Sequence, residues 1–168
     1  MNARKLALLS LPLAFIPIAC EGPAGDAEER EARIMASAYP EGAALYERQC
    51  RACHQSDGQG LAGTFPPLAG HAPELVQAEG GREYFIRVIL WGLGGEIEIR
   101  GERYGGVMPG FARLSDENVA AIINHSIHAW GGEDALPQDF QSIKPEEVSE
   151  LREPRMTPRQ VRETRPEF

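Results

Sequence analysis

The segment Cys50-Arg51-Ala52-Cys53-His54 constrains the fold more than any other part of this 168-residue chain. In a helix the two cysteines stand three positions apart, so both thiols leave the same face. His54 follows directly and brings an imidazole to the same place. In a chain with 3 Cys and 4 His, random order would produce this pattern about 0.001 times. The motif therefore indicates a chemical site.

Three kinds of site use a pair of cysteines spaced in this way. A thioredoxin-like redox pair needs a surrounding βαβ pattern, which the sequence does not show. A zinc site needs two further ligands at paired spacing, and His71, His125 and His128 supply no such pair. Covalent attachment of c-type haem uses two thiols and the following histidine together. We therefore expect both cysteines to form thioether bonds to haem, and His54 to bind its iron.

The composition agrees with one ordinary globular domain. Hydrophobic residues make up 42% and charged residues 25% of the chain, which is a globular balance. The formal net charge of −8 disfavours a nucleic-acid-binding protein, because such proteins are usually basic. Three cysteines are too few for a disulfide framework, and one remains after the motif has used two.

Residues 1–19 have the pattern of an export signal. Arg4 and Lys5 precede an apolar run that is shorter and more interrupted than the roughly 20 apolar residues of a membrane-spanning helix. Cys20 follows Ala19, and a small residue before a cysteine resembles the lipobox of bacterial lipoproteins. This resemblance implies a lipid anchor on Cys20. Ordinary cleavage a few residues later would instead release a soluble periplasmic protein.

The acidic segment 20–39 is rich in Ala and Gly, and we expect it to be a tether with a transient helix over 28–37. Two apolar patterns predict longer helices over 72–93 and from Ser115 to Gly131-Gly132. Between them, Ile97 and Ile99 alternate with glutamates and predict a short strand or ribbon. Past the core, residues 133–168 form an extension in which prolines open short helices near 145 and 158.

From the motif outward, residues 40–132 resemble a class I (mitochondrial-type) single-haem cytochrome c domain of bacterial kind. Gly42 and Tyr46 stand eight and four residues before Cys50, where the family crosses its first helix with its last. The resemblance implies an all-α fold, with three to five helices around one covalently attached haem c and a short ribbon before a methionine loop. The first helix is then expected from Pro40 to Cys53.

The same resemblance implies further roles around the haem. Phe65-Pro66-Pro67-Leu68 is similar to the family's proline loop, so the Pro66 carbonyl is expected to accept a hydrogen bond from His54. Tyr46, Leu68, Tyr104 and Phe111 are expected to contact the cofactor.

Met108-Pro109-Gly110-Phe111 resembles the loop that supplies the second iron ligand. A thioether opposite an imidazole suits iron that cycles between Fe(II) and Fe(III). The other methionines lie in the signal, the tether and the tail. His71 is the rival ligand, although we expect it at the surface. His125 and His128 are also expected at the surface, with a role in the haem's response to pH as the alternative.

These features predict an exported electron-transfer protein, not an enzyme, on the periplasmic side of a bacterial membrane. It would be a tethered carrier or an electron-transfer subunit of a respiratory, photosynthetic, dehydrogenase or reductase complex. A haem-based sensor of small ligands is the third hypothesis. Removal of residues 1–19 takes away two basic residues and no acid, leaving a net charge of −10 and only Lys144 as a lysine. Redox partners should therefore present a basic or apolar face, or meet the Arg-rich tail. The sequence leaves open whether that tail docks a partner or wraps the core.

Overall fold

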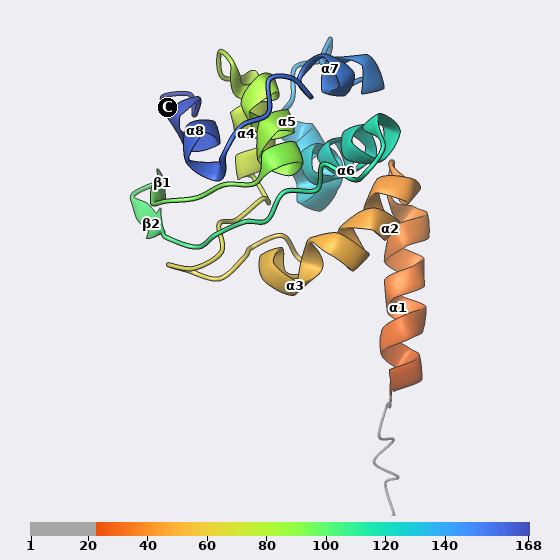
Figure 1. The fold of residues 1–168 in the computed structure, drawn as a ribbon. Coiled ribbons are helices and arrows are strands. Elements are labelled where there is room, and N and C mark those ends of the chain that lie inside the picture. Colours follow the sequence, from red (N-terminus) through yellow and green to blue (C-terminus); the bar gives the residue numbers. More distant parts are fainter. Residues whose placement is uncertain (1–22) are drawn as a thin grey trace, which may run out of the picture.

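The computed structural model describes residues 23–168, and Figure 1 shows them as short helices with one small ribbon. The predicted signal (1–19) and Cys20 lie outside the described residues. The all-α class with a short ribbon is confirmed. In chain order the elements are α1 (Pro23–Ala36), α2 (Pro40–Gln49), α3 (Arg51–His54), α4 (His71–Gln77), α5 (Gly81–Trp91), β1 (Ile97–Ile99), β2 (Glu102–Tyr104), α6 (Asp116–His128), the 3₁₀ helix η1 (Ala129–Ala135), α7 (Pro145–Glu150) and α8 (Pro158–Glu163). Within residues 23–168, no helix is both long and apolar enough to cross a membrane.

Helices α2 and α6 cross at very close range. A Cβ atom at Gly42 would overlap the carbonyl oxygen of Ala121, so only glycine allows this approach. One turn further along α2, the buried ring of Tyr46 packs against His125 and Trp130, with centroid separations of 5.4 and 5.2 Å. The crossing that the sequence predicted from Gly42 and Tyr46 is therefore present.

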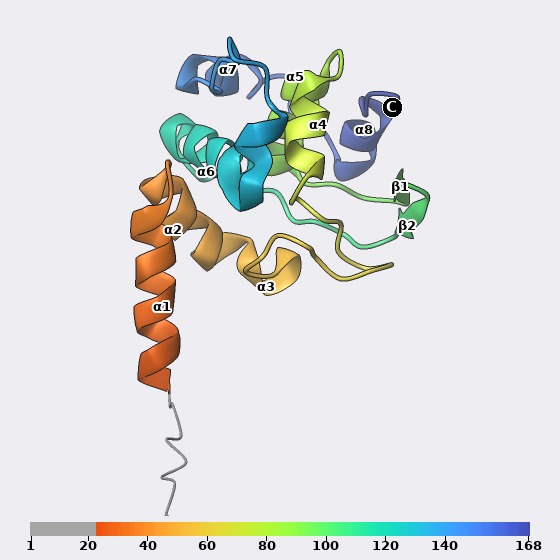
Figure 2. The same cartoon turned by 180° about the vertical axis from the view of Figure 1, so that it is seen from behind.

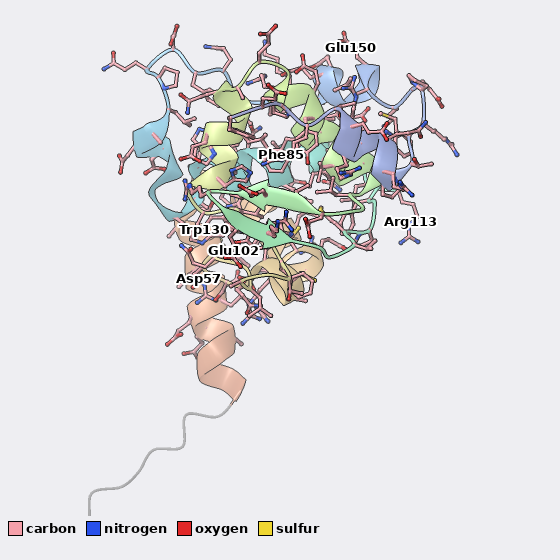
Figure 3. The ribbon with its side chains drawn as sticks, turned by 90° about the vertical axis from the view of Figure 1, so that its left-hand side faces the viewer. Asp57, Phe85, Glu102, Arg113, Trp130 and Glu150 are labelled. Atoms are coloured by element: carbon pink, nitrogen blue, oxygen red, sulfur yellow. The ribbon has the colours of Figure 1, made fainter. Side chains whose placement is uncertain are left out.

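Helix α6 begins as expected and ends earlier than expected. The Ser115 hydroxyl caps its start by accepting a hydrogen bond from the Asn118 amide at 3.3 Å. The helix ends at His128, because Trp130 takes a left-handed backbone conformation with φ of 54°. Its indole leaves the α6 axis, lies over Gly58 and donates a hydrogen bond to the Ser56 carbonyl at 3.1 Å. Figure 3 shows Trp130 near Asp57 of that loop.

The single helix predicted over 72–93 is two helices, α4 and α5. Gly80 has a φ of +73°, which interrupts the α-helical path. A Cβ atom at Gly81 would overlap the Leu75 carbonyl oxygen, so the chain turns back onto α4 here. The apolar positions of both segments remain buried, which is why the periodicity resembled one helix.

The predicted ribbon is an antiparallel pair, in which Ile97 faces Tyr104 and Ile99 faces Glu102. Arg100 and Gly101, with φ values of 52° and 81°, form the two-residue turn. Two positive φ values in succession suit the right-handed twist of a hairpin. Ile97, Ile99 and Tyr104 are buried, so the ribbon covers the interior with one face.

The expected tether contains helix α1, which is longer than the helix predicted over 28–37. Alanine and glutamate, which favour helix, are frequent within it. The helix packs against α2, and Arg33 lies 3.8 Å from the Glu47 carboxylate. Part of the expected tether is therefore helical and contacts α2.

The C-terminal extension packs on the rest of the chain. The Asn124 side chain on α6 donates to the Ile143 carbonyl at 2.9 Å and accepts from its amide at 2.8 Å. Arg152 donates to the Asp116 carboxylate at 2.6 Å and to two carbonyl oxygens near the start of α6. The Arg82 guanidinium pairs with Glu147 at 2.9 Å. Figures 1 and 2 show α7 and α8 beside α5, at the end of the molecule far from α3.

The prediction that His125 lies at the surface is wrong. Its side chain sits at the α2–α6 crossing and its residue is only 8% exposed. The Nδ1 atom lies 3.1 Å from the Ser37 hydroxyl. Burial lowers the pKa of His125 from 6.5 to about 4. His128 lies on the adjacent turn of α6 and is half-buried. Its Nδ1 atom lies 2.9 Å from the Asn124 carbonyl oxygen.

Substitution of Gly42 should test the helix crossing. We expect Gly42→Ala to lower the free energy of unfolding by about 1–3 kcal/mol, because the added methyl overlaps Ala121. In most helices the same change stabilises. Gly105→Ala is the control, because a Cβ there meets no atom within 4 Å. Urea denaturation of the intact protein measures both. Equal stability of the two variants would contradict the close crossing.

The buried His125 should make stability depend on pH. Its pKa is lower in the folded than in the unfolded state, so the unfolded chain takes up the proton first as pH falls. The free energy of unfolding should therefore decline below about pH 6.5 and level off near pH 4. His125→Gln should remove part of this decline, and His71 should account for another part, because burial also lowers its pKa to about 4. Urea denaturation at about pH 7.5 and pH 5 measures the slope; an unchanged slope in the variant would refute this role.

Candidate functional site

A mostly apolar cleft runs between α3 with its following loop, helices α4 and α5, the ribbon and the loop before α6. The space inside it is about 1110 Å³, part of which is open to solvent. Phe85 on α5 is 3% exposed and lies at the centre of the molecule in Figure 3. The apolar residues of the cleft walls are Phe65, Pro66, Pro67, Leu68, Leu75, Phe85, Val88, Ile89, Leu93, Ile97, Ile99, Val107, Met108, Pro109, Phe111 and Ile122.

The cysteine–histidine motif forms one part of the cleft wall. Helix α2 ends at Gln49, and Cys50 joins it to the short helix α3. The amides of Cys53 and His54 both donate to the Cys50 carbonyl, at 3.1 and 2.9 Å. This tight turn brings Cys50, Cys53 and His54 together in the cleft lining. Both cysteines are free thiols.

A backbone carbonyl sets the orientation of the His54 ring. The Nδ1 atom of His54 lies 2.9 Å from the Pro66 carbonyl oxygen, the partner that the sequence resemblance implies. Because a carbonyl only accepts, Nδ1 must carry the proton, and Nε2 keeps a free lone pair. Burial lowers the pKa of His54, and the Pro66 hydrogen bond opposes this only in part. The imidazole is thus neutral, as a metal ligand must be.

Burial also determines the protonation state of Cys50, which is the more buried of the two cysteines. It raises the pKa of the Cys50 thiol to about 12, with a smaller contribution from the neighbouring Cys53. Cys50 therefore stays protonated at neutral pH. A neutral thiol in an apolar wall suits a structural covalent link better than a reactive thiolate.

Met108 belongs to a separate segment of the wall, which the backbone holds firmly. Its amide donates to the Leu93 carbonyl at 2.9 Å, and its carbonyl accepts from the Leu93 amide at 3.0 Å. A Cβ atom at Gly92 would overlap the Met108 carbonyl, so glycine permits this pairing. Three residues later, the Phe111 amide donates to the Ile89 carbonyl at 2.8 Å. Met108 is half-buried and lines the cleft.

The other expected contact residues divide into two groups. Leu68, Tyr104 and Phe111 line the cleft. Tyr46 lies outside it, at the α2–α6 crossing, and its hydroxyl donates to the Gln55 carbonyl at 2.6 Å. Tyr46 is therefore not among the lining residues, and its hydroxyl instead holds the chain just after His54.

The sequence also missed several residues that line the cleft. His71 was expected at the surface, but it is only 7% exposed and forms part of the lining. Its place as the first residue of α4, which turns inward after Gly70, explains the error. Arg165, which follows α8, is a further lining residue, and no local pattern places it there. Tyr84 on α5 also lines the cleft, as the apolar pattern of the helix predicted over 72–93 allows.

The donor set of this cleft fits a covalently bound haem. Two free thiols stand beside a neutral imidazole with one free nitrogen. A thioether, a soft ligand for redox-active iron, lines the same space. The surrounding side chains are apolar and would enclose a flat macrocycle. Cys50 and Cys53 would form the thioethers, while His54 and Met108 would bind the iron.

Comparison with known proteins agrees with this geometry. Residues 37–125 match the family model described as "Cytochrome C oxidase, cbb3-type, subunit III". A cytochrome c-552 of Thermus thermophilus is 50% identical over 127 residues, which are 76% of this chain and 84% of that protein. Similarity also extends to the cytochrome c subunit of a quinone alcohol dehydrogenase from Gluconacetobacter polyoxogenes, at 34% identity over 92 residues. A fructose dehydrogenase cytochrome subunit from Gluconobacter japonicus is 29% identical over 117 residues. The matches cover 19% and 23% of these last two proteins.

The matched region contains the cysteine–histidine motif, the proline loop, the methionine loop and α6 up to His125. The matches to the two dehydrogenase subunits cover only a small part of each, whereas the Thermus protein aligns over most of its length. The chain therefore belongs to the cytochrome c family, as a single-haem class I member whose cofactor is covalently attached haem c.

Proposed function

We propose that this cytochrome is an exported electron carrier, in which Cys50 and Cys53 attach one haem while His54 and Met108 bind its iron. The observation that supports this most strongly is the shared apolar cleft of these four residues, which reach it from two separate segments. When bound, the haem supplies an iron that accepts and releases one electron. The protein's own residues hold it, orient its ligands and exclude water.

The two ligand segments would tune the reduction potential. The Pro66 carbonyl, 2.9 Å from Nδ1, fixes the His54 tautomer and makes the ring a stronger donor. The Met108 thioether favours Fe(II) and so raises the potential. The apolar walls would also raise the reduction potential, because a medium of low polarity disfavours the more highly charged Fe(III).

The firm pairing of Met108 with Leu93 supports electron transfer over sensing of small ligands. A sensor needs an iron position that opens to a ligand such as CO or NO. Two mutual backbone hydrogen bonds, at 2.9 and 3.0 Å, hold Met108 instead. If His54 and Met108 both bind the iron, the chemistry that remains would be transfer of an electron.

The packing of the C-terminal extension favours a carrier over a fixed subunit. An arm that docks a complex should stand away from the core of its own chain. Here Arg82 pairs with Glu147, and Arg152 pairs with Asp116, within the chain itself. The dehydrogenase subunits among the relatives support a dehydrogenase as redox partner, and the matched family model supports an oxidase. Measurement of the protein's size after mild detergent extraction distinguishes a carrier from a fixed subunit. A fixed subunit elutes with its complex, whereas a carrier elutes alone.

The exposed mouth of the cleft supports contact with an apolar partner face. Val107 lines the cleft and is 74% exposed. Leu61, which follows the motif, is 54% exposed. Together with a net charge of −8, these residues suit a partner with an apolar patch and a basic rim. We further propose the periplasmic side of a bacterial membrane as the location, with a lipid on Cys20 as the anchor.

Replacement of Met108 tests the iron ligation. We expect Met108→Ala to lose the low-spin Met/His absorption spectrum and to lower the reduction potential, because the thioether no longer stabilises Fe(II). Met35→Ala is the matched control, since this methionine lies on α1 and is 69% exposed. Absorption spectra during a redox titration provide both readings. An unchanged spectrum in Met108→Ala would exclude Met108 as ligand.

Replacement of Cys20 tests the anchor. In a bacterial host that attaches lipids, Cys20→Ser should move the cytochrome from the membrane fraction to the soluble fraction, because stable anchoring needs the lipid chains. Haem staining of both fractions measures the shift, and the haem content should stay the same. Wild-type protein in the soluble fraction would refute lipid anchoring and favour ordinary signal cleavage.

A further inference from the structure

Trp130 has a backbone conformation that bulky residues rarely adopt. Its φ and ψ angles are 54° and 36°, in the left-handed region that favours glycine. A tryptophan that only filled the core could do so from the buried face of α6, with ordinary helical angles. The left-handed turn instead carries the indole onto the loop that follows the cysteine–histidine motif. Residues held in such a conformation often serve a function, because the surrounding structure must maintain them.

The indole makes two contacts with that loop. Its Nε1 atom donates a hydrogen bond to the Ser56 carbonyl at 3.1 Å. The ring covers Gly58, where a Cβ atom would lie only 2.6 Å from two ring carbons. Figure 3 shows Trp130 near Asp57, which stands between these two residues. Gly58 is buried, whereas Asp57 is exposed, so the indole covers one side of the loop.

The loop under the indole supports the proline loop. The Gly58 carbonyl accepts a hydrogen bond from the Leu68 amide at 2.7 Å. Two residues along, the Gly60 amide donates to the His54 carbonyl at 3.0 Å. A Cβ atom at Gly60 would lie 2.7 Å from the Pro66 carbonyl oxygen, which is the partner of His54 Nδ1. The loop backbone therefore contacts both residues of the His54–Pro66 hydrogen bond.

The start of this loop depends on contacts from outside it. Gln55 directly follows the motif and has a φ of 63° and a ψ of 167°, a combination that is nearly confined to glycine. The hydrogen bond from the Gly58 amide to the Gln55 carbonyl is long, at 3.4 Å. Two aromatic side chains hold successive carbonyls instead: the Tyr46 hydroxyl binds that of Gln55 at 2.6 Å, and the Trp130 indole binds that of Ser56.

We propose that Trp130 is a positioning residue for His54, which keeps the Pro66 carbonyl at hydrogen-bond distance and thereby lowers the reduction potential. This rests on the proposed function, because it requires His54 to bind the haem iron. A hydrogen bond from Nδ1 to a carbonyl makes the imidazole a stronger donor, and a stronger donor stabilises Fe(III) more than Fe(II). A loop released from the indole would weaken this hydrogen bond, and the potential would rise.

Two tryptophan variants test this role. Trp130→Phe removes the indole N–H and keeps an aromatic ring near Gly58. We expect the Met/His spectrum to remain, the reduction potential to rise, and the Nδ1 hydrogen of His54 to exchange with solvent roughly tenfold faster, as the loss of one hydrogen bond would allow. Trp91→Phe is the matched control. Trp91 is also half-buried, lies outside the cleft lining, and its Nε1 has no hydrogen-bond partner among the described residues.

A higher potential in Trp130→Phe than in Trp91→Phe supports the positioning role. A change in the free energy of unfolding alone does not, because a merely structural tryptophan would produce it too. Equal potentials in the two variants, or a potential of Trp130→Phe below that of wild type, would overturn the proposal.

Two glycine variants reach the same contact from the loop. Gly58→Ala places a methyl group against the indole, whereas the nearest atom to a Cβ at Gly63 is a Glu102 carboxylate oxygen at 3.8 Å. The φ angles are +68° and +70°, so alanine is equally strained at both positions and only Gly58→Ala displaces the indole. We expect the potential to rise in Gly58→Ala and not in Gly63→Ala. Combined with Trp130→Phe, Gly58→Ala should add less than its separate shift; full additivity would contradict a shared contact.

A measurement on the wild-type cytochrome does not depend on whether any variant folds. In the reduced state, NMR-detected hydrogen exchange should show similar protection for the Trp130 indole hydrogen and the His54 Nδ1 hydrogen, because one opening of the loop exposes both. Rapid exchange at Trp130 with a protected His54 would overturn the proposal and leave Met/His ligation intact. Absence of the Met/His spectrum in the wild type would instead refute the proposed function, and the positioning role with it.

Discussion

The position of one rigid, flat cofactor relative to Cys50, Cys53 and His54 is the constraint on which the rest of this structure depends. A haem attached at these residues presents two large apolar faces, which the chain must remove from water. The loop after α3, helices α4 and α5, the ribbon and the Met108 segment all contribute apolar side chains to the same cleft. A core of modest size gains much of its buried area in this way. The hydrogen bond from His54 to the Pro66 carbonyl joins the motif to the proline loop, so two parts of the cleft wall are held together.

Features of the fold that arise from local sequence were predictable, and those that arise from close tertiary contact were not. Ser115 caps α6 by a bond to a residue three positions later, and the Ile97/Ile99 alternation reflects one strand. By contrast, the break between α4 and α5 depends on Gly81 meeting the Leu75 carbonyl. The early end of α6 depends on Trp130 covering Gly58. Neither contact leaves a periodic signal in the sequence.

In the candidate site, too, local sequence predicts some residues, and only tertiary packing places the others. The motif is contiguous, so its thiols and imidazole could be placed together from sequence alone, while Met108 needed the likeness to a known family. Tyr46 was expected at the cofactor and His71 at the surface. In the structure, Tyr46 lies at the α2–α6 crossing and His71 lines the cleft. Both residues are near turns whose direction only the packed structure defines. The position of Arg165 in the cleft lining could not be predicted from the sequence, because it depends on how α8 packs against α5.

The extension connects the stability of the fold with the electrostatics of the cofactor. Arg152 and the Asn124–Ile143 pair fasten it to α6, and the Gly94–Pro158 hydrogen bond fastens α8 to the ribbon. These contacts lie far from the proposed iron ligands in sequence, and they hold α8 and the following Arg165 at the edge of the cleft. A loosened α8 would expose that edge to water. Because water around the haem would solvate Fe(III), the reduction potential would fall. In this cytochrome, the segments that secure the fold therefore also take part in setting the energy of the transferred electron.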